Sequence, residues 1–231
     1  MSELNLHSKG MIQMKKARKL TVLAAALSLT LLTACGDSSG NENVKTVPIK
    51  KSVAVYFSRV GNTDFPSDAD ALSSASINRS GDTIKGNAEL IAEYAAAEAG
   101  CETAEIVADK SYPVDYDETV SLAKDEQKAK ERPAVTCQVE SFDDYDTIWL
   151  SFPNWWADLP MPVYSFFDKY DFSGKNIYVF VTHEGSGFSS TVKTIRELEP
   201  DASVVEAISV RGGSVTEKEQ AVRDYVKKQL G

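Results

Sequence analysis

The chain has 231 residues, with 34 acidic against 25 basic side chains and a formal net charge of −9. Its composition is that of a globular protein, its length suits one domain with short appendages, and its acidity argues against a nucleic-acid partner. Only two histidines and three cysteines are present, none of them clustered at metal-ligand spacing, so we expect neither a metal site nor a zinc enzyme.

The N-terminal residues 1–34 are typical of an export signal. A basic stretch, Lys15 to Lys19, precedes an apolar run, Leu20 to Leu32, which is too short to span a bilayer comfortably. The sequence LTACG that follows resembles the lipobox of bacterial lipoproteins, in which the cysteine thiol receives the diacylglycerol. The resemblance implies that Cys35 is lipidated and becomes the first residue of a mature protein anchored at the extracytoplasmic face of the bacterial cell membrane.

The acidity belongs to the mature chain. Residues 1–34 hold five basic side chains and one acidic side chain, which leaves 20 basic against 33 acidic and a formal charge of −13. From Gly36 to about Lys51 the sequence is polar and lacks apolar periodicity, so we predict that 35–51 form the lipidated cysteine and a flexible tether. Two acyl chains would hold the protein at a membrane without a spanning helix. The folded domain is expected at 52–231.

From Ser52 onward, apolar strand patterns alternate with helical patterns. We predict strands at 52–58, 103–107, 147–152, 176–182 and 203–207, and helices at 86–99, 117–132, 161–170, 189–198 and 216–230. Gly100 is expected to end the first helix, and the helix at 117–132 is expected to be exposed to solvent. Alternation of this kind implies a parallel sheet covered by helices on both faces, with ligands at the carboxyl ends of the strands.

Three loops follow the first, third and fourth strands. SRVGNT offers hydroxyls, a glycine and consecutive amides, which suit a phosphate. PNWW has two adjacent tryptophans that are hard to bury together, and THEGSGF has glycines and amides that could reach the polar edge of a flavin. The candidate residues are Ser58, Arg59, Val60, Gly61, Asn62 and Thr63 in the first loop, Pro153, Asn154, Trp155 and Trp156 in the second, and Thr182, His183, Glu184, Gly185, Ser186 and Gly187 in the third.

Together these loops resemble the FMN site of the flavodoxin family. In this resemblance SRVGNT is the phosphate loop, PNWW carries the ring that stacks on the flavin, and THEGSGF follows the polar edge of the ring. The similarity runs from about Ser52 to the C-terminus and includes YPVDYDETVSLAKDEQ, ERPAV, YDFSGK and VRGG. It implies FMN as the cofactor and a flavodoxin-like three-layer α/β sandwich, whose five-stranded parallel sheet has the order 2-1-3-4-5.

The chain departs from the family pattern at two places. A polar insert, Asp64 to Lys85, separates the phosphate loop from the first helix, and its composition predicts a loop that covers the phosphate as a lid. The insert also leaves a second Gly-Asn pair at the start of that helix, which adds Asn87 as a further candidate. Flavodoxins commonly hold the phosphate with neutral groups, so Arg59 either offsets the acidity of the domain there or faces solvent.

Other residues leave alternatives open. We expect Trp155 to stack on the flavin and Trp156 to turn toward the core. His183 and Glu184 either contribute to the site or cap the next helix from the surface. Cys101 and Cys137 either form a disulfide or remain free thiols, because sequence does not give the distance between them.

With FMN bound, the cofactor carries the chemistry and the protein sets its potential, so no catalytic side chain is required. We expect a low-potential electron carrier that serves a redox partner protein or a small-molecule acceptor. An FMN-dependent reductase acting on NAD(P)H or a quinone, with His183 as proton donor, is one alternative. The other is a binding lipoprotein that has kept the fold and lost the flavin.

Overall fold

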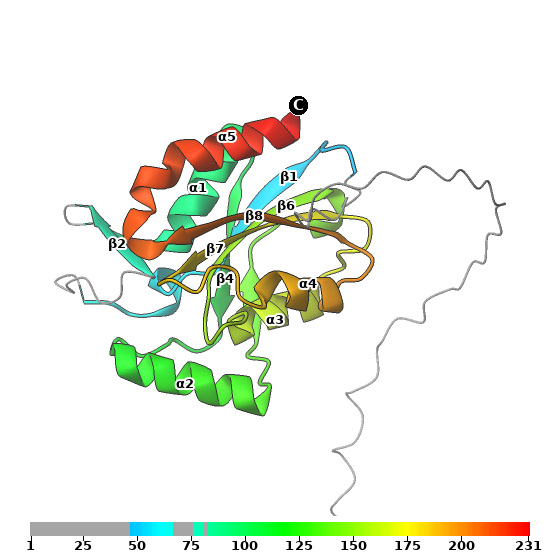
Figure 1. The fold of residues 1–231 in the computed structure, drawn as a ribbon. Helices are drawn as coiled ribbons and strands as arrows, with labels where there is room; N and C mark the ends of the chain where they lie inside the picture. The colour runs from blue at the N-terminus through cyan, green and yellow to red at the C-terminus, as the bar shows by residue number, and fades with distance from the viewer. Residues whose placement is uncertain (1–46, 67–75, 81–82) are drawn as a thin grey trace, which may run out of the picture. The chain divides into compact units, whose positions relative to one another are not determined.

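The computed structural model describes residues 47–66, 76–80 and 83–231 (Figure 1). The predicted export signal, Cys35 and residues 36–46 of the predicted tether lie outside these residues. None of the described helices is long and apolar enough to cross a membrane. The thiols of Cys101 and Cys137 are both free, so these two cysteines do not form a disulfide with each other.

A six-stranded sheet with the order β5-β4-β1-β6-β7-β8 forms the centre of the domain. Its strands are β1 (Ser52–Tyr56), β4 (Thr103–Ala108), β5 (Val135–Cys137), β6 (Thr147–Pro153), β7 (Asn176–His183) and β8 (Ser203–Arg211). Strands β4, β1, β6, β7 and β8 lie side by side in this order and are all parallel. This confirms the predicted order 2-1-3-4-5. The predicted count was too low, because β5 pairs antiparallel with β4 at the edge. Three residues are too few to give a period-2 signal.

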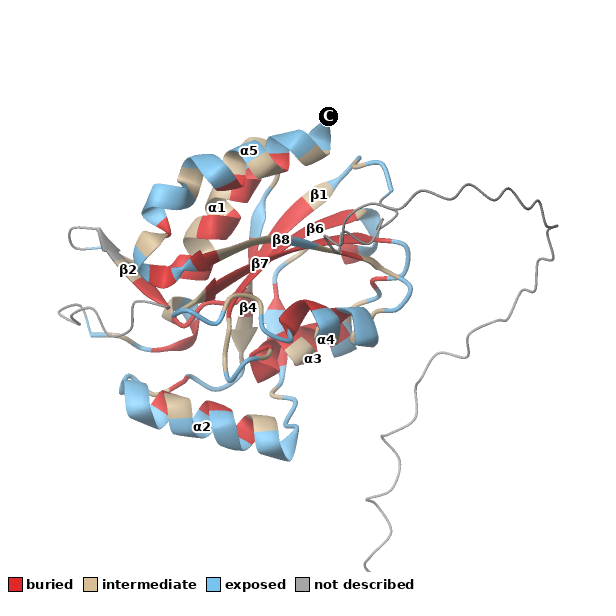
Figure 2. Cartoon of the chain, in the orientation of Figure 1, coloured by how far each residue is buried: buried red, intermediate tan, exposed pale blue. Residues whose placement is uncertain are grey.

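Helices cover both faces of the sheet, as the alternation of elements predicts. The domain has the helices α1 (Asn87–Ala99), α2 (Tyr116–Ala129), α3 (Met161–Lys169), α4 (Thr191–Leu198) and α5 (Glu219–Leu230), of which α2 lies apart from the sheet. Helices α1 and α5 lie on one face of the sheet, and α3 and α4 lie on the other (Figures 1 and 2). Each pair contributes side chains to its own apolar cluster. The central strand β6 serves both clusters, since Ile148 and Leu150 point to one face and Trp149 points to the other.

Helix α1 packs closely on the sheet because its buried face is built from small residues. Ala92, Ala95 and Ala96 are all buried beside Ile91. The helix ends at Gly100, whose φ of 64° is the left-handed conformation that glycine adopts without a Cβ clash. The predicted end of the helix is confirmed.

The insert between β1 and α1 contains a β-hairpin, so the prediction of a loop was wrong there. Strand β2 (Ile77–Ser80) pairs antiparallel with β3 (Thr83–Gly86), and β3 leads directly into α1. The buried side chain of Ile77 explains why this polar segment forms a strand. The remainder of the insert, 67–75 and 81–82, lies outside the described residues, and the predicted lid with it.

The last residues of the predicted tether are bound to the domain. Val47 donates its amide to Asn176 Oδ1 and accepts from Asn176 Nδ2, both at 2.9 Å. The amides of Lys50 and Lys51 donate to the Asp146 carboxylate. Asp146 and Asn176 lie at the amino ends of β6 and β7. The chain therefore enters the domain at the amino ends of the strands, opposite the carboxyl ends where the site is predicted.

Replacing the buried Asn176 by Ala tests this attachment. The change removes both bonds to Val47 and the 3.1 Å bond from Nδ2 to Thr147 Oγ1. We expect the free energy of unfolding to fall by about 1 to 3 kcal/mol in urea titrations. The control is Lys193→Ala on α4, whose side chain is 80% exposed and should change stability by less than about 0.5 kcal/mol. An effect of Asn176→Ala no larger than the control would contradict the attachment.

Candidate functional site

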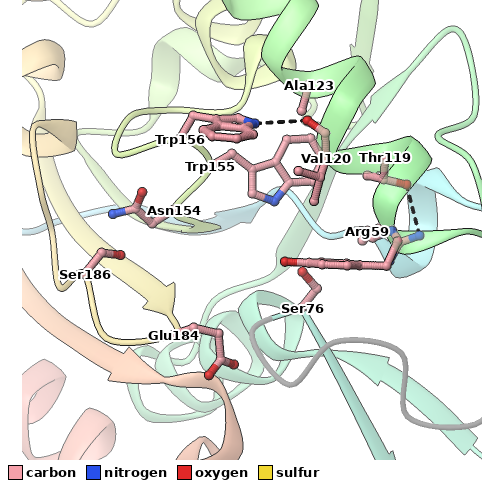
Figure 3. Close-up of a pocket in the computed structure, with 11 residues that line it drawn as sticks. Arg59, Ser76, Thr119, Val120, Ala123, Asn154, Trp155, Trp156, Glu184 and Ser186 are labelled. Carbon is pink, nitrogen blue, oxygen red and sulfur yellow. Dashed lines mark hydrogen bonds between the residues drawn. The ribbon is translucent and has the colours of Figure 1, made fainter.

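A pocket of about 260 Å³ lies at the carboxyl ends of β1, β6 and β7 (Figure 3). Its walls come from the exits of these three strands, from helix α2 and from the residue before the hairpin. It is lined by Arg59, Ser76, Tyr116, Thr119, Val120, Ala123, Asn154, Trp155, Trp156, Glu184 and Ser186. This is the edge of the sheet at which the sequence predicts a ligand.

The pocket brings together residues from all three predicted loops. These are Arg59, Asn154, Trp155, Trp156, Glu184 and Ser186. The other candidates are near it in sequence but do not line it: Ser58, Val60, Gly61, Asn62, Thr63, Pro153, Thr182, His183, Gly185 and Gly187. Much of their role is to build the loops, as their contacts show.

The first loop is held in place by the side chain of Asn62. Its Nδ2 donates to the carbonyls of Ser58 and Ile106 at 2.8 and 3.0 Å, and its Oδ1 accepts from the Ala108 amide at 2.7 Å. These bonds join the exit of β1 to β4 and use every polar atom of the side-chain amide. Asn62 therefore shapes the loop and has no side-chain group left for a ligand.

The start of α1 lies directly against the first loop despite the insert. A Cβ added to Gly86 would lie 1.7 Å from Ser58 Oγ, so only glycine fits there. Glu89 accepts from the Gly86 amide, and the Asn87 amide donates to Ser76 O. The hairpin therefore returns the chain to the place where it left the sheet, and Asn87 is fully buried there without lining the pocket.

A carboxyl group stands behind the first loop. A Cβ added to Gly61 would lie 1.7 Å from Glu105 Oε1, and this oxygen has no hydrogen-bond partner among the described residues. Burial, together with the charge of Glu89, raises the pKa of Glu105 to about 7. Near neutral pH the carboxyl beneath the loop is therefore partly protonated.

Arg59 is buried, with only 1% of its surface exposed, which excludes the alternative that it faces solvent. Its Nη2, with two N–H groups, lies 2.7 Å from the carbonyls of Pro113 and Val114 and 3.0 Å from Thr119 Oγ1, the last contact drawn in Figure 3. Burial lowers the pKa of Arg59, and the nearby Asp115 opposes this. Its Nε and Nη1 have no hydrogen-bond partner in the part of the chain that the structure describes.

Trp155, and not Trp156 as we expected, is the tryptophan that packs against the core. Trp155 packs edge-on against Phe57 and Tyr112, with ring centroids 5.5 and 5.1 Å away. Trp156 remains 42% exposed and does not turn into the core. Because both indoles line the pocket, either could contact a flat ligand.

Trp156 is held in a tight turn with an unusual backbone. Trp155 and Asp158 exchange two backbone hydrogen bonds, and the residues between them, Trp156 and Ala157, have φ of 53° and 62°. This left-handed conformation costs roughly 1 to 2 kcal/mol for each residue with a Cβ. The indole Nε1 donates to Val120 O at 3.0 Å, as Figure 3 shows. Lys124 Nζ lies 4.6 Å from the ring centre. Contacts with α2 thus stabilise the turn.

The third loop is tied to the second by Asn154. Its amide donates to Thr182 O at 2.8 Å, and its Nδ2 donates to Gly187 O and Ser189 Oγ at 3.0 Å. Gly185 and Gly187 have φ of 131° and 60°, conformations that favour glycine. The two loops therefore form one unit along the pocket.

His183 lies at the end of β7, outside the lining of the pocket. Its Nδ1 accepts from the Gly185 amide at 2.8 Å, so the neutral ring carries its proton on Nε2. Burial lowers the pKa of His183, which favours this neutral form. The neighbouring Glu184 does line the pocket, and it forms an ion pair with Arg211 at 3.6 Å.

Helix α2 is the part of the site that sequence reasoning missed. Tyr116, Thr119, Val120 and Ala123 line the pocket, whereas we expected a solvent-exposed helix. These positions are spaced by three or four residues and so share one helical face. Their spacing predicts a helix with one face turned toward the protein. The many charged residues elsewhere on the helix made this pattern hard to recognise in the sequence.

The pocket offers a buried cation, aromatic rings and a carboxylate. Among the described residues, no cluster of histidine, cysteine, aspartate and glutamate could hold a metal ion. The pocket therefore suits an aromatic ligand that carries an anionic group.

Comparison with known proteins supports this assignment of the fold. A flavodoxin family model matches residues 74–229, and no curated protein matches the chain. A candidate flavoprotein from Bacteroides uniformis is 24% identical, with a TM-score of 0.57 over 77% of this chain and 97% of its own. A flavoprotein from Lactobacillus acidophilus, solved in complex with FMN, is 18% identical, with a TM-score of 0.52 over 74% of this chain and 99% of its own. At these identities the structures share the fold.

Glu105 gives the protein a testable pH dependence. Its pKa in the folded protein is about 7, against an ordinary value of 4.5, so between these values the folded state binds more protons than the unfolded state. The free energy of unfolding should therefore fall as pH rises from about 5 to 7. Glu105→Gln should reduce this slope in urea titrations at a series of pH values. Glu197→Gln, in an exposed ion pair on α4, should leave the slope unchanged. Equal slopes in all three proteins would contradict the role of Glu105.

Proposed function

This chain belongs to the flavodoxin family, and from that premise we propose that it binds FMN in the pocket and transfers electrons through it. The flavoprotein from Lactobacillus acidophilus with the same fold was solved in complex with FMN, which supports the choice of cofactor. The residues of this chain give a separate test of whether FMN fits.

The buried Arg59 is the observation that carries the proposal. A guanidinium has five N–H donors, and the three on Nε and Nη1 have no acceptor among the described residues. A buried cation without an acceptor is costly, and a phosphate supplies charged oxygens that make strong hydrogen bonds to arginine. Thr63 Oγ1 of the same loop is also buried and without a partner in the described chain, but it lies outside the lining of the pocket. Arg59 would therefore hold the FMN phosphate.

The aromatic residues of the pocket would hold the flavin ring. Trp155 and Trp156 come from the second loop and Tyr116 from α2, and all three line the pocket that Arg59 also lines. Flat rings stack on one another with favourable dispersion and electrostatic energy. Ser186 and the amides of the third loop would provide hydrogen bonds to the polar edge of the ring. FMN would supply the redox chemistry, and the chain would bind and orient it and exclude water.

The lining of the pocket favours an electron carrier over a reductase. An electron carrier needs no catalytic side chain, because FMN itself would supply the redox chemistry. The position of His183 outside the lining also gives no support to a proton donor there.

We place the protein at the extracytoplasmic face of the bacterial membrane, anchored through lipid on Cys35. This rests on the basic stretch, the apolar run and the lipobox-like LTACG of the sequence. The attachment of Val47 to Asn176 supports an arrangement in which the tether leaves the domain at the amino edge of the sheet. The opposite edge, with the pocket, would then be accessible to a redox partner.

FMN binding is measured first by absorption and fluorescence of the purified protein titrated with FMN. We expect flavin bands with quenched fluorescence, and weakening of binding by on the order of a hundredfold in Arg59→Gln, because a buried charged partner of the phosphate is lost. Arg223→Gln on α5, in an ion pair with Glu219, is the matched control and should bind as the wild type does.

The outcomes separate the three functions. Folded wild type that binds no FMN would contradict the proposal and leave a binding lipoprotein without flavin. Steady-state oxidation of NAD(P)H by the FMN-loaded protein, with a quinone as the electron acceptor and without a partner protein, would favour the reductase. Bound FMN without such turnover is the result expected of a carrier.

Anchoring is tested by expressing Cys35→Ala in a bacterial host and separating membranes from soluble fractions. The wild-type protein should be found with the membrane, and the variant should be released because it has no thiol for the diacylglycerol. Cys101→Ala is the control and should remain with the membrane. Membrane retention of Cys35→Ala would contradict a lipid anchor at this residue.

A further inference from the structure

Arg59 connects two parts of the site that are far apart in sequence. It belongs to the loop after β1, and its Nη2, which carries two N–H groups, lies within hydrogen-bond distance of three carbonyls before α2, those of Pro113, Val114 and Asp115. Thr119 Oγ1, in the first turn of α2, is a further acceptor within reach of the same nitrogen. The guanidinium is therefore the link between the phosphate loop and the N-terminus of the helix that walls the pocket.

Helix α2 has little apolar contact with the rest of the domain. Only Thr119, Ala123 and Glu126 of its 14 residues are buried, whereas Tyr116 and Leu122 are exposed. Helices that pack through a broad apolar stripe, such as α1, have no need of polar links. An element with few buried apolar contacts opens at a lower free energy than the core does.

Polar contacts are what hold α2 in place. Besides Arg59, Tyr112 donates its hydroxyl to Glu126 Oε2 at 2.9 Å, and Trp156 Nε1 donates to Val120 O at 3.0 Å. Gln127 adds a longer bond to Trp156 O at 3.4 Å. Of these links, Arg59 is the one made by a cation that also lines the pocket, and its Nε and Nη1 have no acceptor among the described residues.

We infer that Arg59 is a positioning residue that couples phosphate binding to the docking of α2, so that the phosphate of the flavin orders the helix that covers it. The inference rests on the proposed function and specifies how that same site is regulated.

The physical reason lies in the energy of a buried cation. Without an anion, docking α2 over Arg59 buries a guanidinium with three N–H groups that lack acceptors in the described chain. A phosphate gives these groups charged acceptors and neutralises the cation, so docking becomes more favourable. Because coupling between two equilibria is reciprocal, the docked helix must also raise the affinity for the phosphate.

As a consequence, the wall of the pocket that α2 contributes becomes ordered only when the ligand binds. Tyr116, Val120 and Ala123 reach the pocket only when α2 is docked, and the link from Val120 to Trp156 extends the effect to the second loop. Riboflavin, which has the ring and no phosphate, should occupy the pocket without closing it. The phosphate thus acts on the ring site through the helix.

Hydrogen exchange measured by mass spectrometry on the full mature protein tests the coupling. The amides of 116–129 are compared without ligand, with saturating FMN and with saturating riboflavin, with occupancy followed by flavin fluorescence. In the wild type, FMN should slow their exchange on the order of tenfold more than riboflavin does, a usual scale for coupling between sites. Arg59→Lys keeps the charge but not the planar fork, and it should abolish the difference. Arg223→Lys on α5 should retain it.

A second hydrogen-exchange experiment, with inorganic phosphate in place of a flavin, tests the coupling independently of flavin binding. Inorganic phosphate, compared with chloride at equal ionic strength, should slow exchange of 116–129 in the wild type and not in Arg59→Lys. Equal protection by FMN and riboflavin would overturn the coupling while leaving FMN binding intact. If neither flavin binds, the proposed function fails, and the coupling stands or falls on the phosphate arm alone. Should Arg59→Lys not fold, the two flavins compared in the wild type decide.

Discussion

A buried positive charge must find acceptors, and in this domain Arg59 finds only some of them within the described protein. Its Nη2 is used by the segment that leads into α2, while Nε and Nη1 have no partner among the described residues. The contact between the loop after β1 and the segment before α2 depends on this one side chain, and the proposed FMN phosphate would supply the acceptors that it lacks.

The second loop illustrates how a site can be built at the expense of local backbone energy. The consecutive left-handed residues Trp156 and Ala157 are unfavourable in themselves, and glycine or asparagine would suit the turn better. The turn places a large indole at the rim of the pocket, which glycine could not do. Asp158 stabilises the loop from behind, since it accepts hydrogen bonds from Tyr164 and Thr194 on neighbouring helices.

Much of the candidate site could be predicted because parallel strands bring their carboxyl ends to one edge. Arg59, Trp155 and Glu184 come from loops far apart in sequence, and they line one pocket as expected. The contributions of Ser76 and α2 could not be predicted in this way. Their positions depend on hydrogen bonds such as those from Arg59 to the segment before α2, which no local pattern encodes.

The sequence by itself determined the order of elements, the parallel sheet and the loops that carry the site, because these depend on the periodicity of apolar residues and on the rules of chain connection. Tertiary structure alone decided which side chains reach the pocket. Asn62 turned out to hold the loop, Arg59 to be buried, and Trp156 to remain exposed. The physical reason is that burial and hydrogen-bond partners are set by distant elements, whereas periodicity reports only on the segment in which it occurs.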